Sequence, residues 1–187
     1  MILVDNYVLA KFLGICPFLG ASKKLDSAVG MSLAVTFVMV MATAATWPLY
    51  MGILAPNGLE YLQTIVFILV IAILVQLLEN FLKKFIPALY KSLGVYLPLI
   101  TTNCTILGVT ILNLDNGYSF PESIVCAAGA GIGFLVAMVL FSGVRRKVEQ
   151  AIVPECFKGL PITLVAAAMT SLSFMGFGGI VEAIFGV

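Results

Sequence analysis

The chain has 187 residues, of which 61% are hydrophobic and only 10% are charged, and its mean hydropathy is +1.14. Soluble domains average about 45–50% apolar and about 25% charged residues, so this composition excludes a water-soluble globule. Ten Lys and Arg against nine Asp and Glu give a net charge of +1, and there is no His. This leaves no basic surplus for nucleic acid and no imidazole for zinc or general base chemistry. The sequence therefore indicates an integral membrane protein with no nucleic-acid partner.

Six apolar stretches follow one another along the chain, with short polar connectors between them. They cover residues 1–20, 28–54, 62–82, 92–112, 121–143 and 160–185. A membrane-spanning helix needs about 20 apolar residues, and each stretch is close to that length. We therefore predict one all-α membrane domain over residues 1–187, with six transmembrane helices that cross the lipid bilayer.

The first and fourth stretches contain residues that interrupt helices. Gly14 and Pro17 lie in the first stretch, and Gly94, Pro98 and the polar residues 101–103 lie in the fourth. Such residues open the backbone hydrogen-bond ladder, which membrane proteins tolerate only where protein covers the break. We predict that the first and fourth helices are broken.

The cations gather in alternate connectors. Nine of the ten lie in the first, third and fifth connectors: Lys23, Lys24, Lys83, Lys84, Lys91, Arg145, Arg146, Lys147 and Lys158. Translocated short loops are poor in Lys and Arg, so these connectors are predicted to be cytoplasmic and both termini to lie outside. If the cations only extended from helix ends towards the headgroups, they would be expected at both faces.

Two short motifs recur in the two halves of the chain. Residues 16–20 and 104–108 share the pattern C-x-x-L-G at an offset of 88, and residues 26–29 resemble residues 122–125 at an offset of 96. Each repeat would contain an odd number of helices, three, so the second copy would cross the membrane in the opposite direction to the first, as in inverted repeats. We predict two inverted three-helix repeats, over about residues 1–85 and 88–187. Chance similarity in so apolar a chain is the alternative.

The repeat places Cys16 and Cys104 at equivalent positions beside the two breaks, where we expect both to be buried near the bilayer centre. A buried Cys is usually a small apolar residue. A disulfide is another alternative, although this depth is far from the oxidising compartment. Helix breaks expose N–H groups that stabilise anionic sulfur, and thiolates with such donors bind iron–sulfur clusters. We predict that Cys16 and Cys104 are ligands to the iron of a cluster.

A [2Fe–2S] cluster takes four Cys ligands, so two more are needed. Cys126 lies within the fifth stretch, Cys156 lies in a cytoplasmic connector, and neither has a counterpart in the other repeat. We interpret both as bystanders and expect the cluster to be shared across a subunit interface. A small inverted-repeat secondary transporter is the rival interpretation, but it would need polar or charged groups at the breaks and no symmetric thiols.

A glycine pattern in the fifth stretch resembles a nucleotide-binding motif. Gly129, Gly131 and Gly133 form G-x-G-x-G, but they lie inside an apolar span and lack the preceding strand that a dinucleotide-binding fold requires. We predict a close contact between helices here.

Three segments resemble a known family. Residues 11–18 (KFLGICPF), 22–25 (SKKL) and 97–104 (LPLITTNC) are similar to the RnfA-type subunits of bacterial Rnf complexes, in the RnfA/NqrE family. The resemblance covers essentially the whole chain. The NqrE-type subunits of sodium-translocating NADH:quinone reductases share the plan, but the Cys-Pro-Phe and Thr-Thr-Asn-Cys segments look more like the Rnf subunits. The family's two cluster-binding cysteines fall on Cys16 and Cys104.

The resemblance implies a six-helix subunit that pairs with a homologous RnfE-like subunit of opposite topology. The two would share one intramembrane [2Fe–2S] cluster, the partner supplying the other two iron ligands. It further implies a translocase in the bacterial or archaeal cytoplasmic (inner) membrane, assembled with the B, C, D and G subunits of the Rnf complex. That complex passes electrons from reduced ferredoxin to NAD⁺ and exports Na⁺ or H⁺, and no catalysis by the isolated chain is expected. A hydrocarbon layer of about 30 Å is too thick for one electron hop, so a cluster near its middle would halve the gap.

Overall fold

A computed structural model describes residues 6–22, 25–58, 60–85, 97–151 and 153–185. All regular structure in these ranges is helical, which confirms the predicted all-α class. Three of the described helical spans are long and apolar enough to cross a membrane: Leu25–Asn57, Gln63–Phe81 and Phe120–Gln150. Leu99–Asp115 and Leu160–Gly176 are shorter apolar helices. Of the residues used for the predictions above, Lys23, Lys24, Lys91 and Gly94 lie outside the described residues.

The second predicted stretch is one long helical span. Helix α2 covers Leu25–Leu49, passes into the π-helical turn η1 (Tyr50–Leu54) and ends in the short helix α3 (Ala55–Asn57). The π-helical turn follows Pro48, whose ring removes a backbone donor from the helix. The span ends at Gly58, which adopts the left-handed conformation usual after a helix, with φ 64°.

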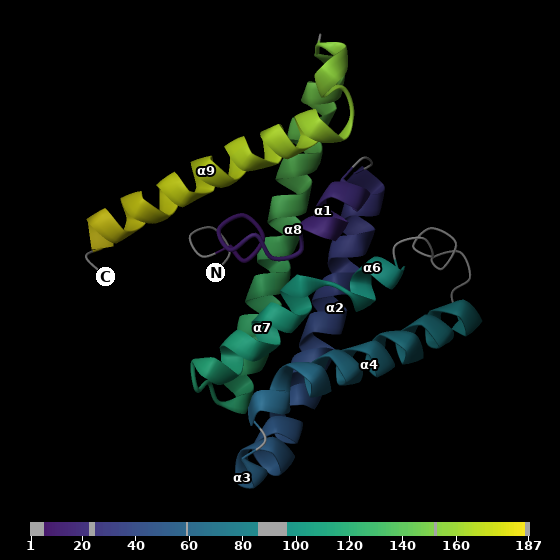
Figure 1. The fold of residues 1–187 in the computed structure, drawn as a ribbon, viewed down its shortest axis with the longest axis vertical. Coiled ribbons are helices and arrows are strands. Elements are labelled where there is room, and N and C mark those ends of the chain that lie inside the picture. The colour runs from purple at the N-terminus through teal and green to yellow at the C-terminus, as the bar shows by residue number, and fades with distance from the viewer. Residues whose placement is uncertain (1–5, 23–24, 59, 86–96, 152, 186–187) are drawn as a thin grey trace.

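Helix α8 (Phe120–Gln150) runs alongside α2, and the two form the long axis of the molecule (Figure 1). Ser119 and Glu122 form a capping box that begins α8. Gly131 allows the close approach, because a Cβ atom there would overlap the Thr36 side chain on α2. The structure thus confirms that part of the glycine pattern serves a close helix contact.

Helices α4 (Gln63–Phe85) and α9 (Leu160–Phe185) extend from opposite ends of the α2–α8 pair and to opposite sides (Figure 1). The single-turn 3-10 helices η2 (Glu60–Leu62) and η3 (Glu155–Phe157) precede them. Both long helices have exposed apolar side chains, among them Ile65, Ile68, Leu69, Ile73, Leu77, Phe81, Leu164, Val165, Met169, Leu172 and Met175. In a membrane such faces are solvated by lipid or covered by other proteins of a complex.

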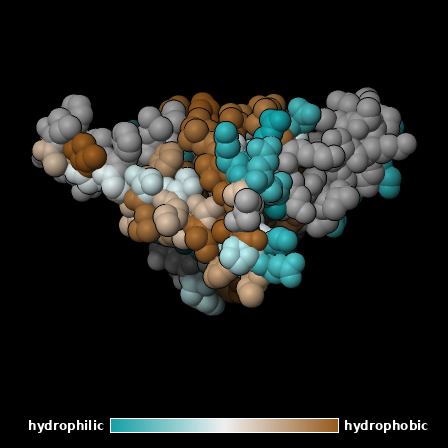
Figure 2. All heavy atoms as spheres, turned by 90° about the horizontal axis from the view of Figure 1, so that it is seen from above, coloured by the Kyte–Doolittle hydropathy of each residue, from teal (hydrophilic) through white to brown (hydrophobic). Residues whose placement is uncertain are grey.

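The core lies where α2 and α8 meet the short helices α1 (Ile15–Ala21) and α7 (Cys104–Asp115). Its largest fully buried side chains in this region are Phe18, Met31, Met39, Ile106, Phe134, Met138 and Phe141. The C-terminal end of α8 is hydrophilic instead, with exposed Arg146, Lys147, Glu149 and Gln150. Figure 2 looks down on that end and shows hydrophilic side chains gathered beside hydrophobic surface.

Candidate functional site

The break in the first stretch lies directly before Cys16. Residues 6–13 form turns, and the backbone reverses through Phe12 and Gly14, whose φ angles are 56° and 83°. Helix α1 begins only at Ile15, so Cys16 lies in its first turn. Asn6 anchors the preceding turns, since its side chain donates to the Gly133 carbonyl of α8 at 2.9 Å. The first stretch is therefore less helical than a span over residues 1–20 would be.

The break in the fourth stretch lies directly before Cys104. The short helix α6 (Leu97–Thr101) ends there, and α7 begins at Cys104. Asn103 is the N-cap of α7: its Oδ1 accepts a hydrogen bond from the Thr105 N–H at 3.0 Å. The Cys104 thiol lies 3.9 Å from the Thr102 carbonyl oxygen and donates to it. Both predicted breaks are present, and each is followed at once by a cysteine in the first turn of a helix.

The two breaks contact each other, although they are about ninety residues apart in sequence. The Thr105 hydroxyl donates to the Leu13 carbonyl at 3.0 Å. A Cβ atom at Gly14 would overlap that hydroxyl and lie 3.0 Å from Asn103 Oδ1. The second break therefore satisfies a backbone carbonyl of the first, as helix interruptions in a membrane require.

The two copies of the C-x-x-L-G motif have the same burial pattern. Cys16 is exposed while Pro17 and Phe18 are buried, and Cys104 is exposed while the next two residues are buried. The last glycine of each copy also contacts the segment that precedes the other copy. A Cβ at Gly20 would lie 3.6 Å from Leu99 Cδ1, and one at Gly108 would lie 2.7 Å from Leu13 Cδ1.

The expectation that Cys16 and Cys104 are buried was wrong for this chain. Both thiols are exposed at its surface, because the residues after each cysteine turn inward to the core. Depth in a membrane and burial within one protein chain are different properties, and hydropathy reports only the first. The exposed position lets a second protein reach both sulfurs.

The other two cysteines lie elsewhere. Cys126 is buried in α8, and Cys156 is exposed in η3. All four cysteines are free thiols, so the disulfide alternative does not apply to this structure. Within the described ranges, no three Cys, Asp or Glu side chains are grouped so that they could hold a metal ion together.

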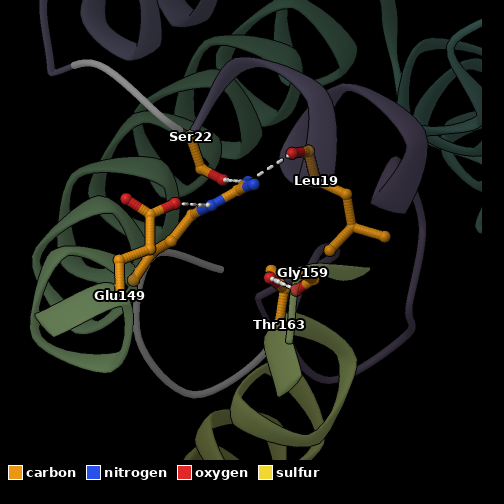
Figure 3. Close-up of polar contacts among 6 residues, drawn as sticks. Leu19, Ser22, Glu149, Gly159 and Thr163 are labelled. Carbon is orange, nitrogen blue, oxygen red and sulfur yellow. Dashed lines mark hydrogen bonds and ion pairs between the residues drawn. The ribbon is translucent and has the colours of Figure 1, made fainter. Parts of the chain in front are cut away.

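Sequence reasoning missed Arg145, which it placed in a solvent-facing connector. Helix α8 instead continues to Gln150, and Arg145 is only 9% exposed. Its Nη1 donates to the Leu19 carbonyl at 2.6 Å and to Ser22 Oγ at 2.8 Å (Figure 3). Its Nε pairs with Glu149 Oε1 at 3.2 Å.

A cavity of about 740 Å³ adjoins this arginine. Arg145 and Cys16 both line it, and so do Glu149 on α8 and Thr163 in the first turn of α9. Figure 3 shows Glu149 and Ser22 on one side of this space and Gly159 and Thr163 on the other. The Thr163 hydroxyl donates to the Gly159 carbonyl at 2.9 Å. One sequence signal could have indicated that Arg145 faces the protein: it follows Phe141 by one helical turn, so the two residues share a face of the helix.

Comparison with known proteins agrees with the resemblance found in the sequence. The family described as "Rnf-Nqr subunit, membrane protein" matches residues 1–181. The chain is 54% identical over 180 residues to the A-type subunit of the ion-translocating oxidoreductase complex of Syntrophotalea carbinolica, covering 96% of this chain and 93% of that protein.

Two further relatives are similarly close. The A-type subunit of the Na(+)-translocating ferredoxin:NAD(+) oxidoreductase complex of Acetobacterium woodii is 54% identical over 178 residues, covering 95% of this chain and 93% of that protein. The A-type subunit of the ion-translocating oxidoreductase complex of Aliivibrio salmonicida is 51% identical over 181 residues, covering 97% and 94%. With a match over nearly the whole length, the chain belongs to the Rnf-Nqr family of membrane-protein subunits.

Proposed function

We propose that the chain is a membrane electron-transfer subunit of an Rnf-type complex. The complex would carry electrons from reduced ferredoxin towards NAD⁺ and couple this to translocation of Na⁺ or H⁺. The names of its relatives, which are A-type subunits of ion-translocating oxidoreductases, support this complex-level activity. The chain would lie in the bacterial or archaeal cytoplasmic membrane, and the cation pattern supports a topology with both termini outside.

The observation that carries the proposal is the matched pair of exposed thiols at two helix breaks that touch. Cys16 and Cys104 would bind the iron of a [2Fe–2S] cluster, since soft thiolates are its usual ligands. The donor set fits half of such a cluster, because two thiols lie at the surface and a homologous RnfE-like partner of opposite topology would supply two more. When bound, the cluster would accept and release electrons within the membrane.

The chain's own residues contribute a rigid frame for the two thiols. Asn103 accepts a hydrogen bond from the Thr105 N–H, and the Thr105 hydroxyl donates to the Leu13 carbonyl, so these two backbone groups at the breaks are not left to lipid. The inward-turning residues after each cysteine fix the short helices to the core, which leaves the sulfurs at the surface. The N-terminal end of a helix also favours the negative charge of a ligated thiolate.

The proposal includes an inverted repeat that relates the two cysteine segments. The equal burial patterns of the two C-x-x-L-G motifs support it. Helices α2 and α8, which would be equivalent in the two halves, pack against each other. Under this arrangement α4 and α9 would also correspond, and each extends away from that pair.

The test is a comparison of four cysteine variants in the intact, purified complex. Cys16→Ser and Cys104→Ser should each abolish the cluster signal in electron paramagnetic resonance, because a hydroxyl is a poor ligand for iron that prefers thiolate. Cys156→Ser should leave the signal unchanged. Cys126→Ala should only weaken packing, by about 1 kcal/mol.

Iron, sulfide and the resonance signal are measured per assembled complex, so that an assembly defect is not mistaken for a lost ligand. If Cys104→Ser retains the signal, or Cys156→Ser removes it in a complex that assembles, the ligand assignment is wrong. Full cluster occupancy in the separately expressed chain would contradict the shared site.

A further inference from the structure

We infer that Arg145 is a positioning residue for the Cys16 half of the cluster site. The inference rests on the proposed function and adds to it a residue that touches neither sulfur. Arg145 acts from α8, through its hydrogen bonds to the C-terminal end of α1.

Helix α1 cannot hold its own conformation. It has seven residues, whereas isolated helices shorter than about 12–15 residues are marginal in water. Its N-cap is Gly14, which has no side chain to cap the first turn, and its last turn contains no basic residue. The position of Cys16 therefore depends on contacts from other elements.

Arg145 supplies one of these contacts where the helix needs it. The last carbonyls of a helix have no partner within the helix. Arg145 Nη1 donates to one of them, at Leu19, and to the hydroxyl of the C-cap residue Ser22. The guanidinium thus caps α1 from a neighbouring helix, at the opposite end from Cys16.

A second contact lies one turn earlier on α8. The rings of Phe18 and Phe141 stack with their centroids 4.2 Å apart. An aromatic stack and a forked hydrogen bond on successive turns of α8 together restrict both the rotation of α1 and its position along α8. Cys16 is then held at the surface, and its thiol direction follows from this docking.

The charge of Arg145 adds a second effect. Arg145 is largely buried, its ion-pair partner Glu149 is mostly exposed, and Arg145 lines the same cavity as Cys16. A positive charge that lines the same cavity stabilises the reduced cluster, which carries one more negative charge than the oxidised one. Loss of the arginine should therefore lower the midpoint potential of the cluster.

The chain offers a matched control for this residue. Arg146 is the next residue on the same helix, and it is exposed. An effect of total charge alone would appear equally in Arg146→Gln, whereas an effect of docking would be confined to Arg145. Arg145→Lys keeps the charge but replaces the planar fork with a single ammonium.

The experiment compares Arg145→Gln, Arg145→Lys and Arg146→Gln in the intact complex. Iron retention against a chelator is measured per assembled complex, and the midpoint potential is measured by redox titration. After iron is removed, alkylation of Cys16 and Cys104 is followed separately by mass spectrometry. We expect Arg145→Gln to lose iron about tenfold faster, as second-sphere substitutions at metal sites do.

In Arg145→Gln the midpoint potential should fall, and Cys16 should alkylate faster while Cys104 does not change. Arg145→Lys should keep the potential and recover part of the iron retention. If Arg145→Gln does not assemble, Ser22→Ala replaces it, since it removes one of the two acceptors of Nη1 and leaves the charge in place. This variant should show smaller increases in iron loss and Cys16 alkylation, with an unchanged midpoint potential.

Wild-type retention and potential in Arg145→Gln would overturn the inference, and so would an equal effect of Arg146→Gln. These results leave the proposed function intact, because that proposal depends on the loss of the signal in Cys104→Ser. Conversely, a retained cluster signal in Cys104→Ser would contradict the proposed function. The separate alkylation rates of Cys16 and Cys104 would still test whether Arg145 positions α1.

Discussion

The two cysteine segments reach the same arrangement by different physical means. Cys104 begins a helix of twelve residues whose N-cap, Asn103, is supplied by the same segment. Cys16 lies in a helix of seven residues that follows a left-handed glycine and has no side-chain cap. The first segment therefore needs Phe141 and Arg145 of α8, whereas the second is largely defined by its own residues.

This difference indicates that two segments with the same motif need not be equally robust. Equal exposure of the thiols and equal burial of the residues after them do not imply equal stability. Damage to distant residues should affect Cys16 more than Cys104. Three substitutions test this difference, from the largest expected effect to the smallest.

Phe18→Ala should have the largest effect on stability. Phe18 is 2% exposed and stacks on Phe141, and truncation of a buried Phe costs about 3–5 kcal/mol. The free energy of unfolding in detergent should fall by that amount, and Cys16 should alkylate faster than Cys104. Phe37→Ala on α2 is the control, since Phe37 is 54% exposed and its loss should change little. Equal alkylation of the two cysteines in Phe18→Ala would show that α1 does not depend on this contact.

Gly14→Ala should be less severe but still clearly destabilising. Gly14 has a φ of +83°, and left-handed backbone costs a residue with a Cβ about 1–2 kcal/mol. The new Cβ would also overlap the Thr105 hydroxyl, so the two breaks would have to separate. We expect a loss of about 2–3 kcal/mol in the free energy of unfolding.

Gly30→Ala is the matched control for this substitution. Gly30 lies inside α2, and a Cβ there would meet nothing within 4 Å. Alanine is the better helix former by about 0.8–1 kcal/mol, so this variant should be as stable as the wild type or more stable. If Gly14→Ala has the same free energy of unfolding as Gly30→Ala, the contact between the two breaks is less close than in the structure.

The sequence predicted the long helices well because length and hydropathy are local properties. The sixth predicted stretch, 160–185, coincides with α9, and the third differs from α4 by only a few residues at each end. The two breaks were also predictable, since Gly14 and residues 101–103 oppose a continuous helix by their own chemistry. The fifth stretch was predicted too short, because α8 continues through its charged residues to Gln150.

The sequence could not predict which side of each break faces the core. Exposure of Cys16 follows from the packing of Phe18 on α8, and the role of Arg145 follows from hydrogen bonds to residues more than 120 positions away. A run of Arg-Arg-Lys is normally an interfacial charge cluster, and only the tertiary contact distinguishes its first member. The number of membrane spans and the inverted repeat stay predictions.

Asn103→Ala should have the smallest effect of the three. It removes the N-cap bond to the Thr105 N–H, a loss that typically costs about 1 kcal/mol. The same change also removes a destabilising contribution, because Asn103 Nδ2 is buried and has no hydrogen-bond partner among the described residues. The net loss in the free energy of unfolding should therefore be about 1 kcal/mol or less.

Asn103→Ser separates these two contributions. Serine keeps an oxygen that can cap α7 and has no amide N–H₂ group, so this variant should equal or exceed the wild type in stability. Both variants should raise Cys16 alkylation less than Phe18→Ala does, because Asn103 meets α1 only near its N-cap Gly14, whereas Phe18 packs directly on α8. A loss of stability in Asn103→Ser relative to the wild type would mean that the amide N–H₂ group of Asn103 does have a hydrogen-bond partner. Alkylation of Cys16 as fast as in Phe18→Ala would show that the second break supports the first as much as α8 does.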